Sequence, residues 1–282
     1  MKRLNKLVVL LLLFVMVLSG CSSNTPTTNN TNSNNTVSSN SKVDNGVTVL
    51  KFKDTITPDE LKKLDGKKVQ ITGFIGGASP LDGSYIYLMN MPYQNCAFCI
   101  PSDNNLGNTI AAYPSKGKTI DYTDTPVTVT GVLTFGAMTD KVGYSYEYSL
   151  QNVEVKKADV SGLEKEVQIY QAIVDKGLVV KYNEIAGLIF EKTSTAKMGA
   201  EVDFKSLTPI SSDAISGLRK LLDGLNSEDY TEVIAVIDTL EDSVNLVNEG
   251  IELENKDSLI RGYDLAESAF ALLYSWLIKP EL

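Results

Sequence analysis

The hydrophobic pattern of this chain changes its period once, near Lys157, and that change limits the folds available to it. Before this point apolar and polar residues alternate, as expected for strands with one buried face. Beyond it apolar residues recur every three or four positions, as they do on amphipathic helices. Strands followed by helices predict an α+β fold, with residues 47–157 as a β domain and residues 158–282 as a helical domain.

Five short strands are predicted in the first part, with glycines and turn residues between them. They centre on residues 69–75, 85–91, 109–113, 127–133 and 144–150. Short strands with glycine bends and one longer excursion favour a small five-stranded β-barrel of the OB type, and a fragment of a β-sandwich is the alternative. After Leu150 the apolar residues change sides, which predicts a β-bulge near Gln151 and Asn152.

The second part carries apolar stripes at helical spacing, separated by short connections. Short connections place neighbouring helices antiparallel, so an antiparallel α-helical bundle is predicted. Ser211 or Ser212 is expected to cap one helix and Ser227 the next. Residues 158–282 hold 11 basic and 23 acidic side chains, which predicts a solvated acidic surface.

The N-terminus has the pattern of an exported protein. A basic start precedes an apolar run at residues 7–18, which is too short for a permanent membrane span and is typical of a secretory signal peptide. The run ends in Leu18-Ser19-Gly20-Cys21, which resembles the lipobox of bacterial lipoproteins. The resemblance implies a signal peptide over residues 1–20 and acylation of Cys21 with chains such as palmitate. Such chains would anchor the protein to the extracytoplasmic face of the cell membrane.

Composition and charge narrow the range of partners. Residues 21–46 are mostly Ser, Thr and Asn, so they are predicted to form a disordered tether. Removal of residues 1–20 takes away three basic residues, and the formal charge becomes 23 − 35 = −12. No basic stripe suits phosphate, so nucleic acid is not expected as a partner. The predicted partners are the membrane, reached through the lipid anchor, and an envelope protein or a small ligand.

Cys96 and Cys99 are the residues with the clearest chemical potential, and one interpretation makes them metal ligands. Cys-x-x-Cys is half of a tetrahedral zinc site, to which Asp103 could add an oxygen. Alternatively, Met89 and Met91 share a strand face that leads into this loop, and their thioether sulfurs would favour Cu(I). Methionines on a strand face more often fill a core. The candidate cofactors are therefore zinc and Cu(I).

Two further interpretations of Cys96 and Cys99 stay open. They can form a disulfide with each other, because Cys21 is taken by lipid and the compartment outside the membrane permits disulfides. They can also act as a thiol–disulfide oxidoreductase pair. That role needs a helix N-terminus to stabilise a thiolate, whereas residues 101–105 have the composition of a turn.

No catalytic residue is predicted. The chain has no histidine, which removes the usual general base, and no nucleophile elbow is present. Tyr144, Tyr146 and Tyr148 share one strand face. Such a row either covers a core or forms a stacking platform for a flat ligand or a sugar.

Two segments resemble an uncharacterised OB-fold-like family of the bacterial envelope. Residues 64–74, with the sequence LDGKKVQITGF, and residues 91–101, with the sequence MPYQNCAFCIP, match its Gly-Lys-x-Val-x-Ile-x-Gly-Phe strand and its Pro-Tyr segment. In that family the Pro-Tyr segment leads to a Cys-x-His-x-Pro loop. Cys99 falls where the family has histidine, and Cys96 is displaced by one place from its cysteine.

Together these features predict a lipid-anchored binding protein whose Cys96–Cys99 loop holds a ligand or a metal ion. The alternatives are an oxidoreductase that uses the same cysteines and a structural envelope adapter that binds protein through its helical bundle.

Overall fold

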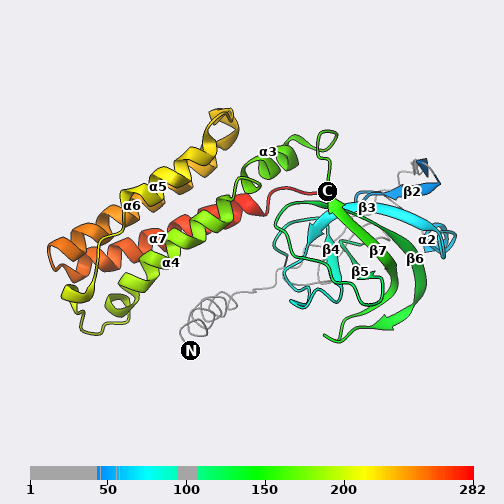
Figure 1. The fold of residues 1–282 in the computed structure, drawn as a ribbon, viewed down its shortest axis with the longest axis horizontal. Helices are drawn as coiled ribbons and strands as arrows, with labels where there is room; N and C mark the ends of the chain where they lie inside the picture. The colour runs from blue at the N-terminus through cyan, green and yellow to red at the C-terminus, as the bar shows by residue number, and fades with distance from the viewer. Residues whose placement is uncertain (1–42, 45, 55, 57, 95–106) are drawn as a thin grey trace, which may run out of the picture. The chain divides into compact units, whose positions relative to one another are not determined.

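The strands and the long helices occupy separate stretches of the chain, as Figure 1 shows. This computed structural model describes residues 43–44, 46–54, 56, 58–94 and 107–282. They belong to one compact unit that spans residues 39–282. The fold is α+β, and the period change near Lys157 marks the end of its last strand.

The described strands form one mixed sheet of seven. Their bounds are β1 (Val43–Asp44), β2 (Val47–Leu50), β3 (Lys68–Ile75), β4 (Ile86–Met89), β5 (Thr109–Pro114), β6 (Val127–Thr139) and β7 (Ser145–Lys157). The order is β1-β2-β3-β4-β5-β7-β6, and β3 also pairs with β6. β2 runs parallel to β3, and β5 runs parallel to β7, while the other pairings are antiparallel.

The prediction of a small five-stranded OB-like barrel is wrong, because the described residues form a seven-stranded mixed sheet. Alternation of apolar residues shows which side chains face a core, but it carries no information about which strands are neighbours. The pattern also gave no sign of β1 and β2, which hold only two and four residues. The bulge prediction is confirmed: the register of β6 and β7 shifts between Thr130 and Val132, and Asn152 has a φ of +54°.

Six α-helices lie in the described residues. They are α2 (Pro58–Lys62), α3 (Lys165–Val174), α4 (Leu178–Lys197), α5 (Ser212–Arg219), α6 (Thr231–Glu252) and α7 (Lys256–Leu277). Ser211 caps α5 through the backbone N–H of Asp213, as predicted. Ser227 instead begins the 3₁₀ turn η3 (Ser227–Tyr230) that precedes α6. None of the described helices is both long and apolar enough to cross a membrane.

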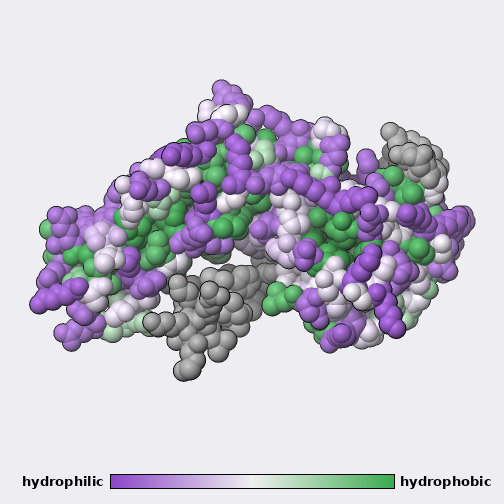
Figure 2. Space-filling model, in the orientation of Figure 1, coloured by the Kyte–Doolittle hydropathy of each residue, from purple (hydrophilic) through white to green (hydrophobic). Residues whose placement is uncertain are grey.

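The helices α6 and α7 form an antiparallel hairpin around a buried apolar seam. Asn255 in the connection accepts hydrogen bonds from the backbone N–H groups of Asp257 and Ser258, which caps α7. The seam is lined by fully buried side chains such as Leu240 and Leu259. Figure 2 shows hydrophilic residues over much of the helical surface, as the acidic composition predicts.

Tyr170 of α3 connects the helical core to the sheet. Its ring meets Phe74 of β3 edge-on at 5.6 Å between centroids and stacks on Trp276 of α7 at 5.8 Å. Its hydroxyl donates to the backbone oxygen of Asp124 over 2.7 Å. Phe74 is 1 % exposed and packs within the helical core cluster. The division into separate domains at residues 47–157 and 158–282 stays a prediction. The contacts of Tyr170 connect these two parts of the chain.

Candidate functional site

The predicted site residues fall outside the part of the chain that the structure describes. Cys21, Cys96, Cys99 and Asp103 all lie in the segments 1–42 and 95–106. The metal, disulfide and redox interpretations of Cys96 and Cys99 therefore stay predictions. The described residues on either side of 95–106 form the base of this loop, and they can be built up in detail.

The two flanks of the loop are held together at one end of the β4–β5 ladder. Met89 pairs with Thr109 in the register of that ladder. One residue further on, the backbone N–H of Asn90 donates to the oxygen of Asn108 over 3.2 Å. The N–H of Gly77 donates to the oxygen of Gln94 over 3.0 Å, which ties the entering strand to the neighbouring turn. These bonds fix the points at which the cysteine-bearing segment leaves and rejoins the sheet.

Two amide side chains at this base carry buried oxygens without a partner. Asn90 is 4 % exposed, and its Nδ2 donates to Oε1 of Glu281 over 3.0 Å. The Nε2 of Gln94 donates to Sδ of Met91 over 3.4 Å. Within the described chain, Oδ1 of Asn90 and Oε1 of Gln94 accept no hydrogen bond. A buried acceptor without a donor costs about 1–3 kcal/mol, so both oxygens favour a donor from outside the described residues.

The two methionines have different surroundings. Met89 is fully buried and packs with Tyr85 and Tyr87. It therefore fills the core, which was the alternative to a role as a Cu(I) ligand. A Cβ on Gly76 would lie 2.3 Å from Sδ of Met89, so any larger residue there would force the buried methionine side chain to move. Met91 is half-buried beyond the end of β4, and its sulfur already accepts the bond from Gln94.

A cluster of tyrosines lies on the sheet beside this base. Tyr85 stacks on Tyr113 at 5.0 Å and meets Tyr87 edge-on at 5.4 Å, while Tyr144 meets Tyr87 edge-on at 5.7 Å. The hydroxyls of Tyr113 and Tyr146 are hydrogen-bonded to each other. Of the predicted row, Tyr144 and Tyr146 therefore help to cover a core.

Tyr148, the third member of the predicted row, lies elsewhere. Its ring packs against Phe135 at 5.9 Å and belongs with the larger apolar cluster of the sheet. Tyr148 and Tyr146 keep the same parity on β7, and they belong to different clusters because they lie at different positions along the strand. Burial, the larger cause, and the nearby carboxylate of Glu147 raise the pKa of Tyr148 to about 12.

Asp140 organises the polar edge of the tyrosine cluster. Its Oδ1 accepts the backbone N–H groups of Val142, Gly143 and Tyr144 over 2.9, 2.9 and 3.1 Å, which closes the turn between β6 and β7. Its Oδ2 accepts the hydroxyl of Tyr87 over 2.5 Å. Sequence reasoning missed this carboxylate, because a turn residue with several structural bonds has no periodic signal.

Burial favours the neutral form of Tyr87 and Tyr146 in this cluster. It raises the pKa of Tyr87 well above its usual range, and the hydrogen bond to Asp140 adds to the effect. Burial also raises the pKa of Tyr146, with a further contribution from the hydroxyl of Tyr113. Neutral phenols donate and accept hydrogen bonds but do not act as bases at ordinary pH. The phenols beside the loop base can therefore bind and orient through hydrogen bonds.

Metal ligands do not converge anywhere in the residues that the structure describes. Over 43–44, 46–54, 56, 58–94 and 107–282, no group of three or more Asp, Glu, Cys or His side chains could hold a metal ion.

Comparisons with known proteins add little. No family model matches the chain, and no curated protein matches it. A DUF3299 family protein from Pseudomonas aeruginosa is 18 % identical, with a TM-score of 0.27 over 39 % of this chain and 70 % of that one. An aspartyl tRNA synthetase from Entamoeba histolytica is 14 % identical, with a TM-score of 0.22 over 71 % of this chain and 37 % of that one. Similarities this low support no conclusion about fold or function.

Proposed function

We propose that this chain is a lipid-anchored extracytoplasmic binding protein, which holds a ligand or a metal ion with its Cys96–Cys99 loop. The observation that carries the proposal is the loop base. There Asn90 and Gln94 present buried amide oxygens that lack donors among the described residues. A ligand held at this end of the sheet would supply the missing donors, or an ion would take the oxygens as ligands.

The proposed location rests on the N-terminus. An apolar run that ends at Cys21 would direct export and acylation, and several acyl chains on one residue contribute about 0.8 kcal/mol for each buried methylene. The Ser/Thr/Asn-rich tether that follows would let the folded part reach away from the lipid surface.

Binding is favoured over catalysis by the chemistry near the loop. Burial raises the pKa of Tyr87 and Tyr146, and the carboxylate of Asp140 accepts hydrogen bonds from three backbone N–H groups and Tyr87. The chain contains no histidine that could act as a general base. The cysteines would thus serve as ligands or as a brace for the loop.

The test is the metal content and intact mass of the full chain, purified without oxygen or chelator. We expect about one equivalent of zinc or Cu(I), lost in a Cys96→Ser/Cys99→Ser variant and retained in a Ser115→Ala control. A metal-free protein with two reactive thiols would argue against the metal form of the proposal. If one of these thiols also titrates well below about 8.5, the oxidoreductase alternative would replace binding.

The anchor has its own test. Cys21→Ser should yield a protein without acyl chains, uncleaved or released from the membrane, while its folded part stays intact. Mass spectrometry and membrane fractionation measure this. Mature acylated protein from the variant would exclude Cys21 as the lipid site.

A further inference from the structure

The sheet gathers exposed lysines from three stretches that lie far apart in the sequence. Lys68 belongs to β3 and Lys156 to β7, while Lys116 and Lys118 lie in the turn after β5. All four residues are exposed, and we call them the lysine patch. The sequence shows no basic run here, because only the strand pairing brings these residues together.

Glu154 of β7 lies at the centre of the patch. It pairs with Thr130 of β6, which pairs in turn with Gln70 of β3. Lys68 lies two positions from Gln70 on β3, and Lys156 lies two positions from Glu154 on β7. Residues two positions apart share a strand face, so both lysines lie on the face of this row. Nζ of Lys156 is 3.0 Å from Oε1 of Glu154.

The turn after β5 lies beside the same row. Pro114, the last residue of β5, pairs with Val153, the residue before Glu154. Lys116 and Lys118 follow Pro114 within four positions. They therefore border Glu154 from a third strand connection.

The patch carries more positive charge than it neutralises. Four lysines and one carboxylate give a formal charge of 4 − 1 = +3. The hydrogen bond and the charge of Lys156 lower the pKa of Glu154, and the charges of Lys68 and Lys118 add to this effect. Lys68, Lys116 and Lys118 form no ion pair with any residue that the structure describes.

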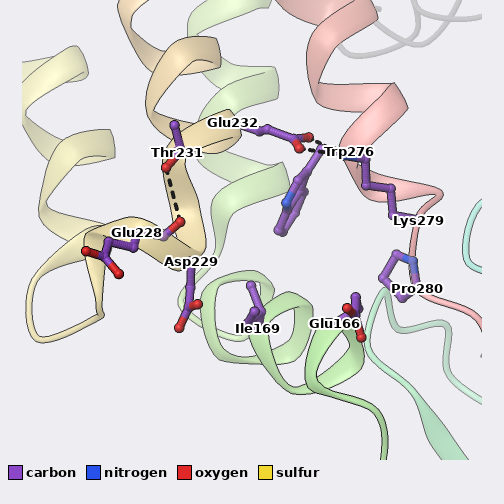
Figure 3. A pocket seen from close by; sticks show the side chains of 9 residues that line it. All are labelled: Glu166, Ile169, Glu228, Asp229, Thr231, Glu232, Trp276, Lys279 and Pro280. Carbon is purple, nitrogen blue, oxygen red and sulfur yellow. Dashed lines mark hydrogen bonds and ion pairs between the residues drawn. The ribbon is translucent and has the colours of Figure 1, made fainter.

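The rest of the folded chain does not offer such a surface. At the turn before β3, Asp65 and Lys67 cancel each other in formal charge. Among the helices several lysines are paired with carboxylates, as Lys279 is with Glu232 in Figure 3. Residues 158–282 hold 11 basic and 23 acidic side chains, so the helical part is strongly negative.

The chain enters the sheet next to the patch. Val43, the first residue that the structure describes, pairs with Thr48 of β2. Thr48 pairs with Val69 of β3, the neighbour of Lys68. Two strand spacings are about 10 Å. Only 21 residues separate Val43 from Cys21, and the coil that their composition predicts spans about 25 Å. The proposed anchor would thus keep the patch close to the lipid surface.

We propose that the lysine patch docks on anionic phospholipid headgroups of the membrane that anchors the chain. This inference rests on the proposed acylation of Cys21. A lysine near an anionic membrane surface strengthens binding about fivefold, and several lysines act together. The same surface repels the acidic helices, so the sheet faces the lipid and the helices face away from it.

The test uses the full lipid-anchored chain in vesicles of phosphatidylcholine, alone or in an equal mixture with phosphatidylglycerol. Mass spectrometry after acylation with a water-soluble reagent measures how fast each lysine reacts. We expect Lys68 and Lys118 to react about threefold or more slowly in the anionic vesicles, and high salt should abolish the difference. Lys205 and Lys220, exposed lysines of the helical part, should react equally in both.

Two double variants with the same change in net charge connect the protection to the patch. Lys68→Gln/Lys118→Gln should abolish the protection of Lys156 in the anionic vesicles. Lys205→Gln/Lys220→Gln should leave that protection unchanged.

Four outcomes would overturn the proposal. Patch lysines that react equally in both vesicles, with the chain bound to each, would exclude docking and leave the anchor intact. A chain that floats with neither vesicle would exclude both. Protection that inorganic phosphate produces in phosphatidylcholine vesicles would assign the patch to free phosphate. Protection that rises with the protein-to-lipid ratio would assign it to the acidic helices of a second copy.

Discussion

At the scale of single residues, two tyrosine hydroxyls join parts of the chain that are far apart in sequence. Tyr87 donates to Asp140, and Tyr170 donates to the backbone of Asp124, in both cases across more than forty positions of the chain. Each bond joins elements that the sequence pattern treats separately. Loss of one of these hydroxyls should therefore lower the free energy of unfolding more than loss of the hydroxyl of an exposed tyrosine.

Tyr87→Phe should lower the free energy of unfolding by about 1–3 kcal/mol, because a hydrogen bond to a charged acceptor is lost and Oδ2 of Asp140 is left without its phenol. Denaturant unfolding monitored by circular dichroism measures the change. Tyr274→Phe is the matched control, since Tyr274 is 40 % exposed and should change stability by less than about 0.5 kcal/mol. Equal effects of the two substitutions would show that the Asp140 bond adds nothing.

The same burial predicts a loss of stability in alkali. Burial raises the pKa of Tyr170 well above its unfolded value of about 10, so the folded state keeps a proton that the unfolded chain releases. Stability is then fully present below pH 10 and falls by about 1.4 kcal/mol per pH unit above it for this phenol. Tyr170→Phe should remove this contribution of about 1.4 kcal/mol per pH unit from the dependence of the free energy of unfolding on pH. Denaturant titrations between pH 9 and 11 measure that dependence. An unchanged slope would mean that the phenol titrates normally.

At the scale of elements, the α6–α7 hairpin depends on close approach of its helices. A Cβ on Gly262 would lie 2.7 Å from Cγ2 of Val247 and 3.2 Å from the backbone oxygen of Ser243. Gly262→Ala should therefore lower stability by about 1–3 kcal/mol, despite the better helix propensity of alanine. In α4 nothing lies within 4 Å of a Cβ on Gly187, so Gly187→Ala should raise stability by up to about 1 kcal/mol. Thermal unfolding of the two variants checks the opposite signs.

Local patterns in the sequence predicted elements better than they predicted neighbours. The helical stripes and the bulge at Asn152 were predictable, because period and parity are properties of one segment. The parallel pairing of β2 with β3 was not, since a four-residue strand next to a distant partner carries no such signal. Part of the tyrosine cluster was predictable, because Tyr85 and Tyr87 alternate along one strand and so share a face. The hydrogen bond from Tyr87 to Asp140 was not, because the two residues are brought together only by the fold. In the same way, only the structure shows that Trp276 lines a pocket (Figure 3).

At the scale of the whole molecule, the sheet contacts both the helices and the segment that follows α7. Phe74 and Tyr170 join β3 to α3, while the backbone N–H of Leu282 donates to the oxygen of Asn90 over 2.9 Å. The second contact lies at the base of the cysteine loop, so the end of the chain helps to hold the proposed binding site. Unfolding of the helices should therefore disturb that base as well.

Phe74→Ala tests whether the two halves unfold together. The side chain is 1 % exposed within the helical core cluster, although it belongs to a strand, so its removal should cost about 3–5 kcal/mol. We expect one cooperative transition at lower temperature, with the helical signal at 222 nm and the fluorescence of Trp276 lost together. Phe135→Ala is the control, because Phe135 packs only within the sheet and is half-buried. If Phe74→Ala instead splits the transition in two, residues 47–157 and 158–282 are independent domains and the shared contacts are too weak to couple them.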